Sequence, residues 1–93
     1  MKYFNWNQDK NLRLKVERGI SFDDIVFYIS NGFLLDTVKN PKAEKYKNQK
    51  IFVVNIDNYA YLVPFIESED EIFLKTIIPN RKATKKYFGD TKQ

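Results

Sequence analysis

Residues 51–66 read IFVVNIDNYAYLVPFI, and this stretch decides the fold. Two runs rich in β-branched and aromatic residues, Ile51–Ile56 and Tyr59–Ile66, flank Asp57-Asn58, a pair that favours a tight turn. We expect an antiparallel hairpin, because a two-residue connection cannot join parallel strands. Pro64 lacks a backbone N–H, so its position predicts a bulge or a sheet edge.

Further strands are expected on both sides of this hairpin. Phe33–Val38 is typical of a strand, and Asn40-Pro41 followed by the charged run Lys42–Lys50 is typical of a loop. After a turn at residues 68–70, Ile72–Ile78 predicts the last strand. The short connections indicate an antiparallel meander of about four strands.

Two helices are expected before the sheet. Asn7 can cap a surface helix over residues 8–18, and Gly19 supplies a left-handed stop. Ser21 and Asp24 then resemble a capping box. The next helix carries four apolar residues at i, i+3, i+4 and i+7, which predicts one buried face: Phe22, Ile25, Val26 and Ile29.

One short helix, Arg81–Phe88, is expected after the sheet and before Gly89. The order of elements predicts an α+β fold in which the helices pack on one face of a single sheet. A chain of 93 residues has room for one core, so we expect a single domain over residues 1–93. Trp6 is expected to anchor the N-terminal segment in that core.

The composition excludes several kinds of chemistry. The chain contains no Cys, which excludes disulfides, a thiolate nucleophile and zinc fingers, and no His, the commonest general base. No leader sequence is evident, and no apolar run approaches the length that spans a bilayer. We therefore expect a cytoplasmic protein without a membrane partner.

The basic residues are concentrated at the C-terminal end. Residues 1–74 carry ten Lys or Arg against eleven Asp or Glu, whereas residues 75–93 carry six against Asp90 alone. A basic segment on a balanced body favours a polyanionic partner such as nucleic acid, although a solvated helix face explains the same charges. On the hairpin's second strand, Tyr59 and Tyr61 share a face with Val63 and Phe65. That face is either a base-binding surface or half-buried core.

Both ends of the chain resemble the BrnT-type toxin family. Phe4-Asn5-Trp6, Lys10-Asn11 and RGISFDD at residues 18–24 look like the opening of these proteins, and IIPNRKATKKY at residues 77–87 looks like their C-terminal signature. The family consists of small ribonucleases with a RelE-like fold. Each is inhibited by a ribbon-helix-helix antitoxin, and operator DNA is bound only through that complex. The resemblance implies this fold, this activity and this partner here.

The chain departs from the family pattern in three places. Val63-Pro64-Phe65 stands where members often have His or another polar residue, Thr76 where many have Arg, and Pro79-Asn80 where Ser-Ala is usual. Arg81 and Lys82 match the family motif.

A ribonuclease can work without metal or cofactor, because RNA supplies its own 2′-hydroxyl nucleophile. Cations must then stabilise the phosphorane, and proton transfer must come from Lys, Tyr, Glu or Asp. The catalytic candidates are Arg81 as a phosphate clamp, together with Lys75, Lys82 and Tyr87. Tyr87 either donates a proton or packs inward. The candidates for binding RNA are three further lysines: Lys50, Lys85 and Lys86.

The resemblance therefore implies a metal-independent endoribonuclease, with these residues as its candidate site. The alternative is a non-catalytic module that binds nucleic acid or an antitoxin, which the absence of His and the altered strand before Phe65 favour.

Overall fold

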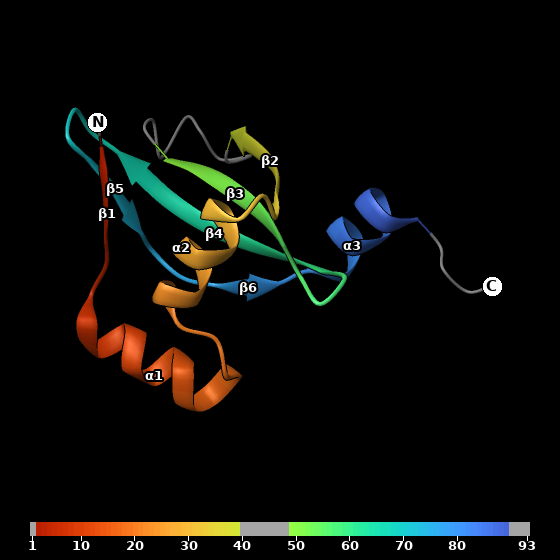
Figure 1. Cartoon of the computed structure of the whole chain (residues 1–93), viewed down its shortest axis with the longest axis horizontal. Helices are drawn as coiled ribbons and strands as arrows, with labels where there is room; N and C mark the ends of the chain where they lie inside the picture. The colour runs from red at the N-terminus through yellow and green to blue at the C-terminus, as the bar shows by residue number, and fades with distance from the viewer. Residues whose placement is uncertain (1, 40–48, 90–93) are drawn as a thin grey trace.

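The computed structural model describes residues 2–39 and 49–89, and within them the chain has an α+β architecture (Figure 1). The helices and strands follow in chain order: β1 (Tyr3–Asn5), α1 (Gln8–Arg18), α2 (Phe22–Ser30), β2 (Leu34–Lys39), β3 (Gln49–Ile56), β4 (Tyr59–Glu67), β5 (Glu71–Leu74), β6 (Ile78–Pro79) and α3 (Arg81–Phe88). Most of the predicted loop after Asn40 lies outside the described residues, whereas its last two positions belong to β3.

The strands form one sheet in the order β1-β5-β4-β3-β2, with β6 paired to β4. The antiparallel meander of β2 to β5 confirms the sequence prediction. The described residues contain six strands rather than about four, for two reasons. The predicted strand Ile72–Ile78 is divided into β5 and β6, and β1 pairs in parallel with β5 through Phe4 and Ile72. A parallel strand of three residues carries no alternating pattern from which to predict it.

The central hairpin forms as expected. Ile56 pairs with Tyr59, and the turn residues Asp57 and Asn58 have φ angles of 55° and 65°, the left-handed conformation of a type I′ turn.

Pro64 lies opposite a one-residue bulge, as the sequence predicted. Phe65 pairs with Leu74 and Leu62 with Ile78, so the three residues 75–77 stand opposite only two residues of β4, Val63 and Pro64. The Pro64 carbonyl accepts a hydrogen bond of 2.8 Å from the N–H of Lys75, so its ring nitrogen also faces that side, where β5 has ended and β6 has not begun. Because the ring nitrogen does not face β3, Pro64 removes no hydrogen-bond donor from the pairing of β3 with β4.

The first two helices begin at their predicted caps, and α1 also ends at the predicted residue. The Asn7 side chain accepts from the backbone N–H of Lys10, and Gly19 ends α1 with a φ of 75°. Ser21 and Asp24 form a complete capping box at the start of α2.

The core lies between α2 and one face of the sheet. Phe22 and Ile25 of α2 are fully buried against this face, where Phe52 and Phe65 stack with ring centroids 3.9 Å apart. Trp6 stacks on Phe22 at 5.8 Å, which confirms its role as an N-terminal anchor. Helix α1 contributes little to this core and lies on the surface beside α2 (Figure 1).

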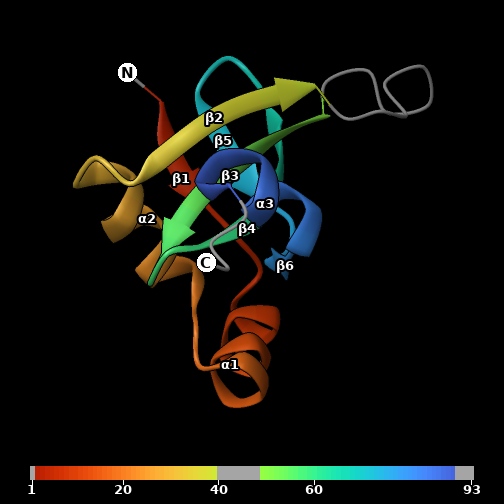
Figure 2. The same ribbon diagram turned by 90° about the vertical axis from the view of Figure 1, so that its right-hand side faces the viewer.

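The third helix packs on the opposite face, so the prediction that all helices share one face is wrong (Figure 2). Side chains alternate along a strand, so Val53 and Ala60 point away from the face that α2 covers. Both are buried although neither belongs to the main core, and the N–H of Ala60 donates to the Thr84 hydroxyl of α3 at 2.9 Å. The short link Asn80 between β6 and α3 carries the chain to this second face.

Candidate nucleic-acid interface

Helix α3 presents most of the predicted site residues. Asn80 caps it by accepting a 2.7 Å hydrogen bond from the N–H of Ala83, so Arg81 stands at the first helical position. Four exposed cations then fall within two turns: Arg81, Lys82, Lys85 and Lys86. The last three are spaced i, i+3 and i+4 and therefore lie on neighbouring positions of one helix face. We call these four side chains the α3 cations.

The α3 cations keep their charge available. The side chains of Arg81, Lys82 and Lys85 form no hydrogen bond or ion pair with another of the residues that the structure describes. Lys86 lies over the ring of Tyr87 at 5.4 Å from its centroid. Permanent cations without carboxylate partners are what a phosphate backbone needs.

Two contacts fix α3 to the sheet. The Thr84 hydroxyl accepts from the Ala60 N–H and donates to the Asn80 carbonyl at 2.8 Å. One turn later, the Tyr87 hydroxyl donates to Asp36 of β2 at 2.7 Å. The α3 cations are thus held at a defined place beside the second face of the sheet.

Tyr87 is partly exposed, and its hydroxyl is engaged. The Asp36 carboxylate that accepts its proton raises the pKa of Tyr87 above 10.0, because ionising the phenol would break the bond and place two negative charges together. The same bond, together with the backbone N–H of Thr37 and the charge of Lys86, lowers the pKa of Asp36. Tyr87 is therefore a weaker proton donor than an ordinary tyrosine.

Lys75 lies apart from α3 but on the same side of the sheet. Its backbone pairs with Pro64, three residues along β4 from Tyr61, the residue that pairs with Pro79 just before α3. Three residues of strand span about 10 Å. The ammonium group lies over the Phe73 ring at 5.7 Å and has no carboxylate partner among the described residues.

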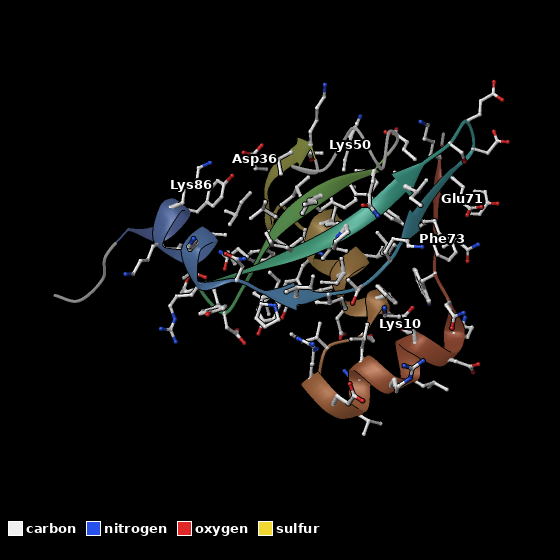
Figure 3. All side chains as sticks on the ribbon, turned by 180° about the vertical axis from the view of Figure 1, so that it is seen from behind. Lys10, Asp36, Lys50, Glu71, Phe73 and Lys86 are labelled. Atoms are coloured by element: carbon white, nitrogen blue, oxygen red, sulfur yellow. The ribbon has the colours of Figure 1, made fainter. Side chains whose placement is uncertain are left out.

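Lys50 is separated from the other candidates. It alternates with Ile51 on β3 and so belongs to the face that α2 covers, and its ammonium group pairs with Glu67 at 3.4 Å. Glu67 also binds Lys2, and these two lysines lower its pKa. In the view from behind, Lys86 and Asp36 lie close together near α3, whereas Lys50 lies farther from α3 along the sheet (Figure 3).

Sequence reasoning missed Asp36 and Thr84. Asp36 is 51 residues from Tyr87 in the chain, and an exposed carboxylate in a strand carries no sign of a distant partner. Thr84 did carry a weak indication, because a hydroxyl inside a short helix rich in basic residues most often forms a hydrogen bond to the backbone.

The described residues contain no group of three or more acidic side chains that could hold a metal ion. No helix among them is long and apolar enough to cross a membrane.

Comparisons with protein-family models, with curated proteins and with solved structures found no match.

Proposed function

We propose that the chain is a metal-independent endoribonuclease that acts in the cytoplasm as the toxin of a type II toxin–antitoxin pair. The single observation that carries the proposal is the set of α3 cations, which form no ion pair with a carboxylate of the described residues and are held in place by the contacts of Thr84 and Tyr87. The resemblance of residues 3–87 to BrnT-type toxins supports the same function. The order of two helices, an antiparallel meander and a terminal helix supports a RelE-like fold.

The reaction sets three tasks: the 2′-hydroxyl must lose its proton, the negative charge on the phosphorane must be stabilised, and the leaving 5′-oxygen must be protonated. In the proposed reaction the RNA 2′-hydroxyl gives its proton to water and attacks the adjacent phosphorus, the bond to the 5′-oxygen breaks, that oxygen takes up a proton from Tyr87 or from water, and a 2′,3′-cyclic phosphate forms. Arg81 holds two phosphate oxygens with its planar guanidinium group, and Lys82 and Lys75 stabilise the charge that develops on the phosphorane. Lys85 and Lys86 bind the flanking phosphates of the strand.

The proton transfers involve Tyr87 and Asp36. The raised pKa keeps Tyr87 protonated, which a proton donor to the leaving 5′-oxygen must be. However, the hydrogen bond to Asp36 has to break before the Tyr87 hydroxyl can donate to RNA. Tyr87→Phe and Asp36→Ala separate the two possible roles of Tyr87, because each removes one partner of the hydrogen bond. If Tyr87 donates the proton, Tyr87→Phe abolishes most cleavage and Asp36→Ala does not. If Tyr87 only positions α3, both variants lower cleavage alike.

Cleavage of RNA by the purified protein in EDTA tests the activity. Arg81→Ala should lower the rate by about 10²–10³-fold, the loss typical of a donor aimed at developing charge. Arg13→Ala is the matched control, because Arg13 is an exposed arginine on α1, and it should leave the rate nearly unchanged. Intact RNA after incubation with the refolded wild-type protein, with and without divalent cations, would exclude the enzyme.

A non-catalytic module that binds nucleic acid or an antitoxin is the second candidate. It is favoured by the position of Lys50 on the other face and by the raised pKa of Tyr87, since both leave fewer groups for catalysis. Such a module should bind RNA without cutting it. Each of Arg81→Ala and Lys85→Ala should then weaken binding by a similar, modest factor.

The proposed partner is a ribbon-helix-helix antitoxin, with operator DNA bound only by the complex. Expression of the chain alone should arrest growth, and co-expression with the adjacent reading frame should relieve the arrest and yield a co-purifying small protein. An adjacent frame whose product neither binds nor relieves the arrest would remove the antitoxin from the proposal.

A further inference from the structure

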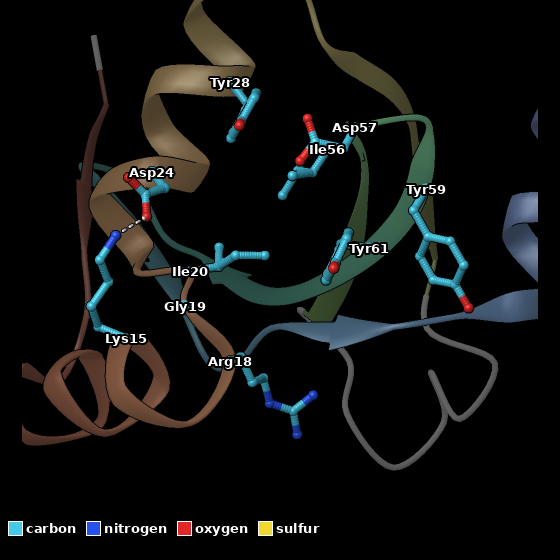
Figure 4. Close-up of a pocket in the computed structure, with 10 residues that line it drawn as sticks. All are labelled: Lys15, Arg18, Gly19, Ile20, Asp24, Tyr28, Ile56, Asp57, Tyr59 and Tyr61. Atoms are coloured by element: carbon cyan, nitrogen blue, oxygen red, sulfur yellow. Dashed lines mark hydrogen bonds and ion pairs between the residues drawn. The ribbon is translucent and has the colours of Figure 1, made fainter.

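A pocket of about 500 Å³ opens beside the face of the sheet that α2 covers (Figure 4). The end of α1, the start of α2 and the tip of the β3–β4 hairpin enclose it, and none of the seven residues proposed for RNA cleavage lines it. Its volume lies in the range typical of sites for small ligands.

Local structure places the walls of this pocket. Gly19, in the left-handed conformation, turns the chain from α1 toward α2, and the capping box at Ser21 fixes that turn. On the other side, the type I′ turn brings Asp57 to the hairpin tip, next to Tyr59. The pocket is therefore bounded by two segments whose backbone geometry is specified by the sequence.

Aromatic and aliphatic side chains line the interior. Ile56 is buried, Ile20 is half-buried, and Tyr28, Tyr59 and Tyr61 are each partly exposed to the pocket. Tyr59 and Tyr61 meet edge to face at 5.8 Å. No hydroxyl of these three tyrosines has a hydrogen-bond partner among the described residues, so all three hydroxyls remain available to a ligand. These surfaces suit a planar ring.

Two charges at the pocket are unpaired, and they have opposite signs. Lys15 and Asp24 neutralise each other across a 3.0 Å ion pair. Arg18 at the end of α1 and Asp57 at the hairpin tip have no ionic or hydrogen-bonding partner among the described residues, and they stand on opposite sides of the pocket with Tyr61 between them (Figure 4). A matching ligand carries an anion at one end and hydrogen-bond donors at the other.

We propose that this pocket binds a guanine nucleotide, with the base against the tyrosines, its donor edge on Asp57 and its phosphate on Arg18. A carboxylate only accepts hydrogen bonds, and guanine alone among the four bases presents two adjacent donors, N1–H and the 2-amino group. Adenine and cytosine place an acceptor nitrogen beside their amino group, and uracil offers a single N–H between two carbonyls. Asp57 therefore selects guanine. This proposal does not depend on the proposed ribonuclease activity, because the two sites share no residue.

Calorimetric titration of the full chain with 5′-GMP, 5′-AMP, 5′-UMP and guanosine tests the pocket. We expect GMP to bind at least tenfold more tightly than AMP, since a bidentate pair discriminates between bases by about that factor or more. Guanosine should bind more weakly than GMP, because it lacks the group that Arg18 recognises. The absence of binding at millimolar GMP, or equal affinity for GMP and AMP, would overturn the proposal.

Two variants test the assigned roles without disturbing the fold. Asp57→Asn suits the left-handed turn position and should remove the preference for GMP over AMP. Arg18→Gln should weaken GMP about tenfold and leave guanosine unchanged, whereas Arg13→Gln, an exposed position on the same helix, should change neither. An Asp57→Asn protein that still prefers GMP contradicts the assignment. A single-stranded tetranucleotide with one guanine then distinguishes a nucleic-acid strand from a free nucleotide as the source of the bound guanine. The tetranucleotide competes with GMP if the pocket accepts a strand, and it fails to compete if the pocket accepts only free nucleotides.

Discussion

The hydroxyl of Tyr87 donates a 2.7 Å hydrogen bond to the carboxylate of Asp36, joining the last helix to the edge strand β2. This contact holds α3 on the second face of the sheet, and it couples the position of the α3 cations to the ionisation of two groups. The pKa of Asp36 is lowered and that of Tyr87 is raised.

The first prediction concerns the ionisation of Tyr87. Replacing Asp36 with Asn removes the negative charge that opposes phenolate formation, so the pKa of Tyr87 should fall toward 10.0. Ultraviolet titration of tyrosine ionisation, with Tyr87→Phe spectra subtracted in each background, isolates this one group among the six tyrosines. An identical titration of Tyr87 with and without the Asp36 carboxylate would show that the bond does not form in solution.

The same bond predicts a dependence of stability on pH. The lowered pKa of Asp36 gives a stabilisation that is present above pH 3.8 and is lost as the pH falls through the folded value below it. The raised pKa of Tyr87 gives a second stabilisation, which is present below pH 10.0. It is lost as the pH rises through the pKa of Tyr87 in the folded protein, which lies above 10.0. The difference in unfolding free energy between wild type and Asp36→Asn should therefore shrink at both extremes, as urea denaturation across the pH range can measure.

Thr84 supports a third prediction. Thr84→Val keeps the shape of the side chain but leaves the buried N–H of Ala60 without an acceptor, so it should lower the free energy of unfolding by about 1–3 kcal/mol. Thr84→Ser retains the hydroxyl and should cost much less. Urea denaturation measures both. Equal losses in the two variants would mean that the methyl group, and not the hydrogen bond, fixes α3.

Local patterns were enough to predict the elements that build the core. The hairpin around Asp57-Asn58 and the helix that starts at Ser21 were predictable because a turn, a capping box and a helical repeat are each specified within a few residues. The exposed cationic face of α3 followed in the same way from spacing along one helix.

Features that depend on distant residues were not predictable from the pattern. The face that α3 covers is set by its bonds to Ala60 and Asp36, which are 24 and 51 residues away from their partners. Pro64 predicted a bulge or an edge, but the break between β5 and β6 that provides the bulge is set by the pairing of β4 with both strands, which no local pattern specifies. The pocket beside Tyr61 likewise required the relative position of α1 and the hairpin.

Asn11 is the buried polar residue that joins the first two helices, and it carries the fourth prediction. Its side-chain oxygen accepts the N–H of Phe22 at 2.6 Å, and its amide donates to Asp23 at 3.3 Å. Asn11→Ala leaves that buried N–H unpaired and should cost about 1–3 kcal/mol of unfolding free energy. The neighbouring exposed Leu12, changed to Ala, should alter stability by no more than about 0.5 kcal/mol.

Asn11→Asp separates the two hydrogen bonds of that side chain. The carboxylate still accepts from Phe22, but it faces the carboxylate of Asp23 where an amide donor stood. The variant should be destabilised at neutral pH and recover part of its stability in acid, when one of the two carboxyl groups is protonated. Denaturation midpoints at neutral and acid pH measure this, and a loss that grows on acidification would contradict the contact with Asp23.

The stacked pair Phe52 and Phe65 gives the last prediction, because it lies at the centre of the core between the two longest strands. Phe65→Ala should lower the free energy of unfolding by about 3–5 kcal/mol. Native domains have only about 5–15 kcal/mol in total, so this variant should lose a large fraction of its stability. Phe27, which is 62% exposed on α2, provides the control, since Phe27→Ala should change stability by about 0.5 kcal/mol or less. Phe65→Leu refills most of the space and should fall between the two. Comparable losses for Phe65→Ala and Phe27→Ala would mean that the core does not lie between α2 and this face of the sheet.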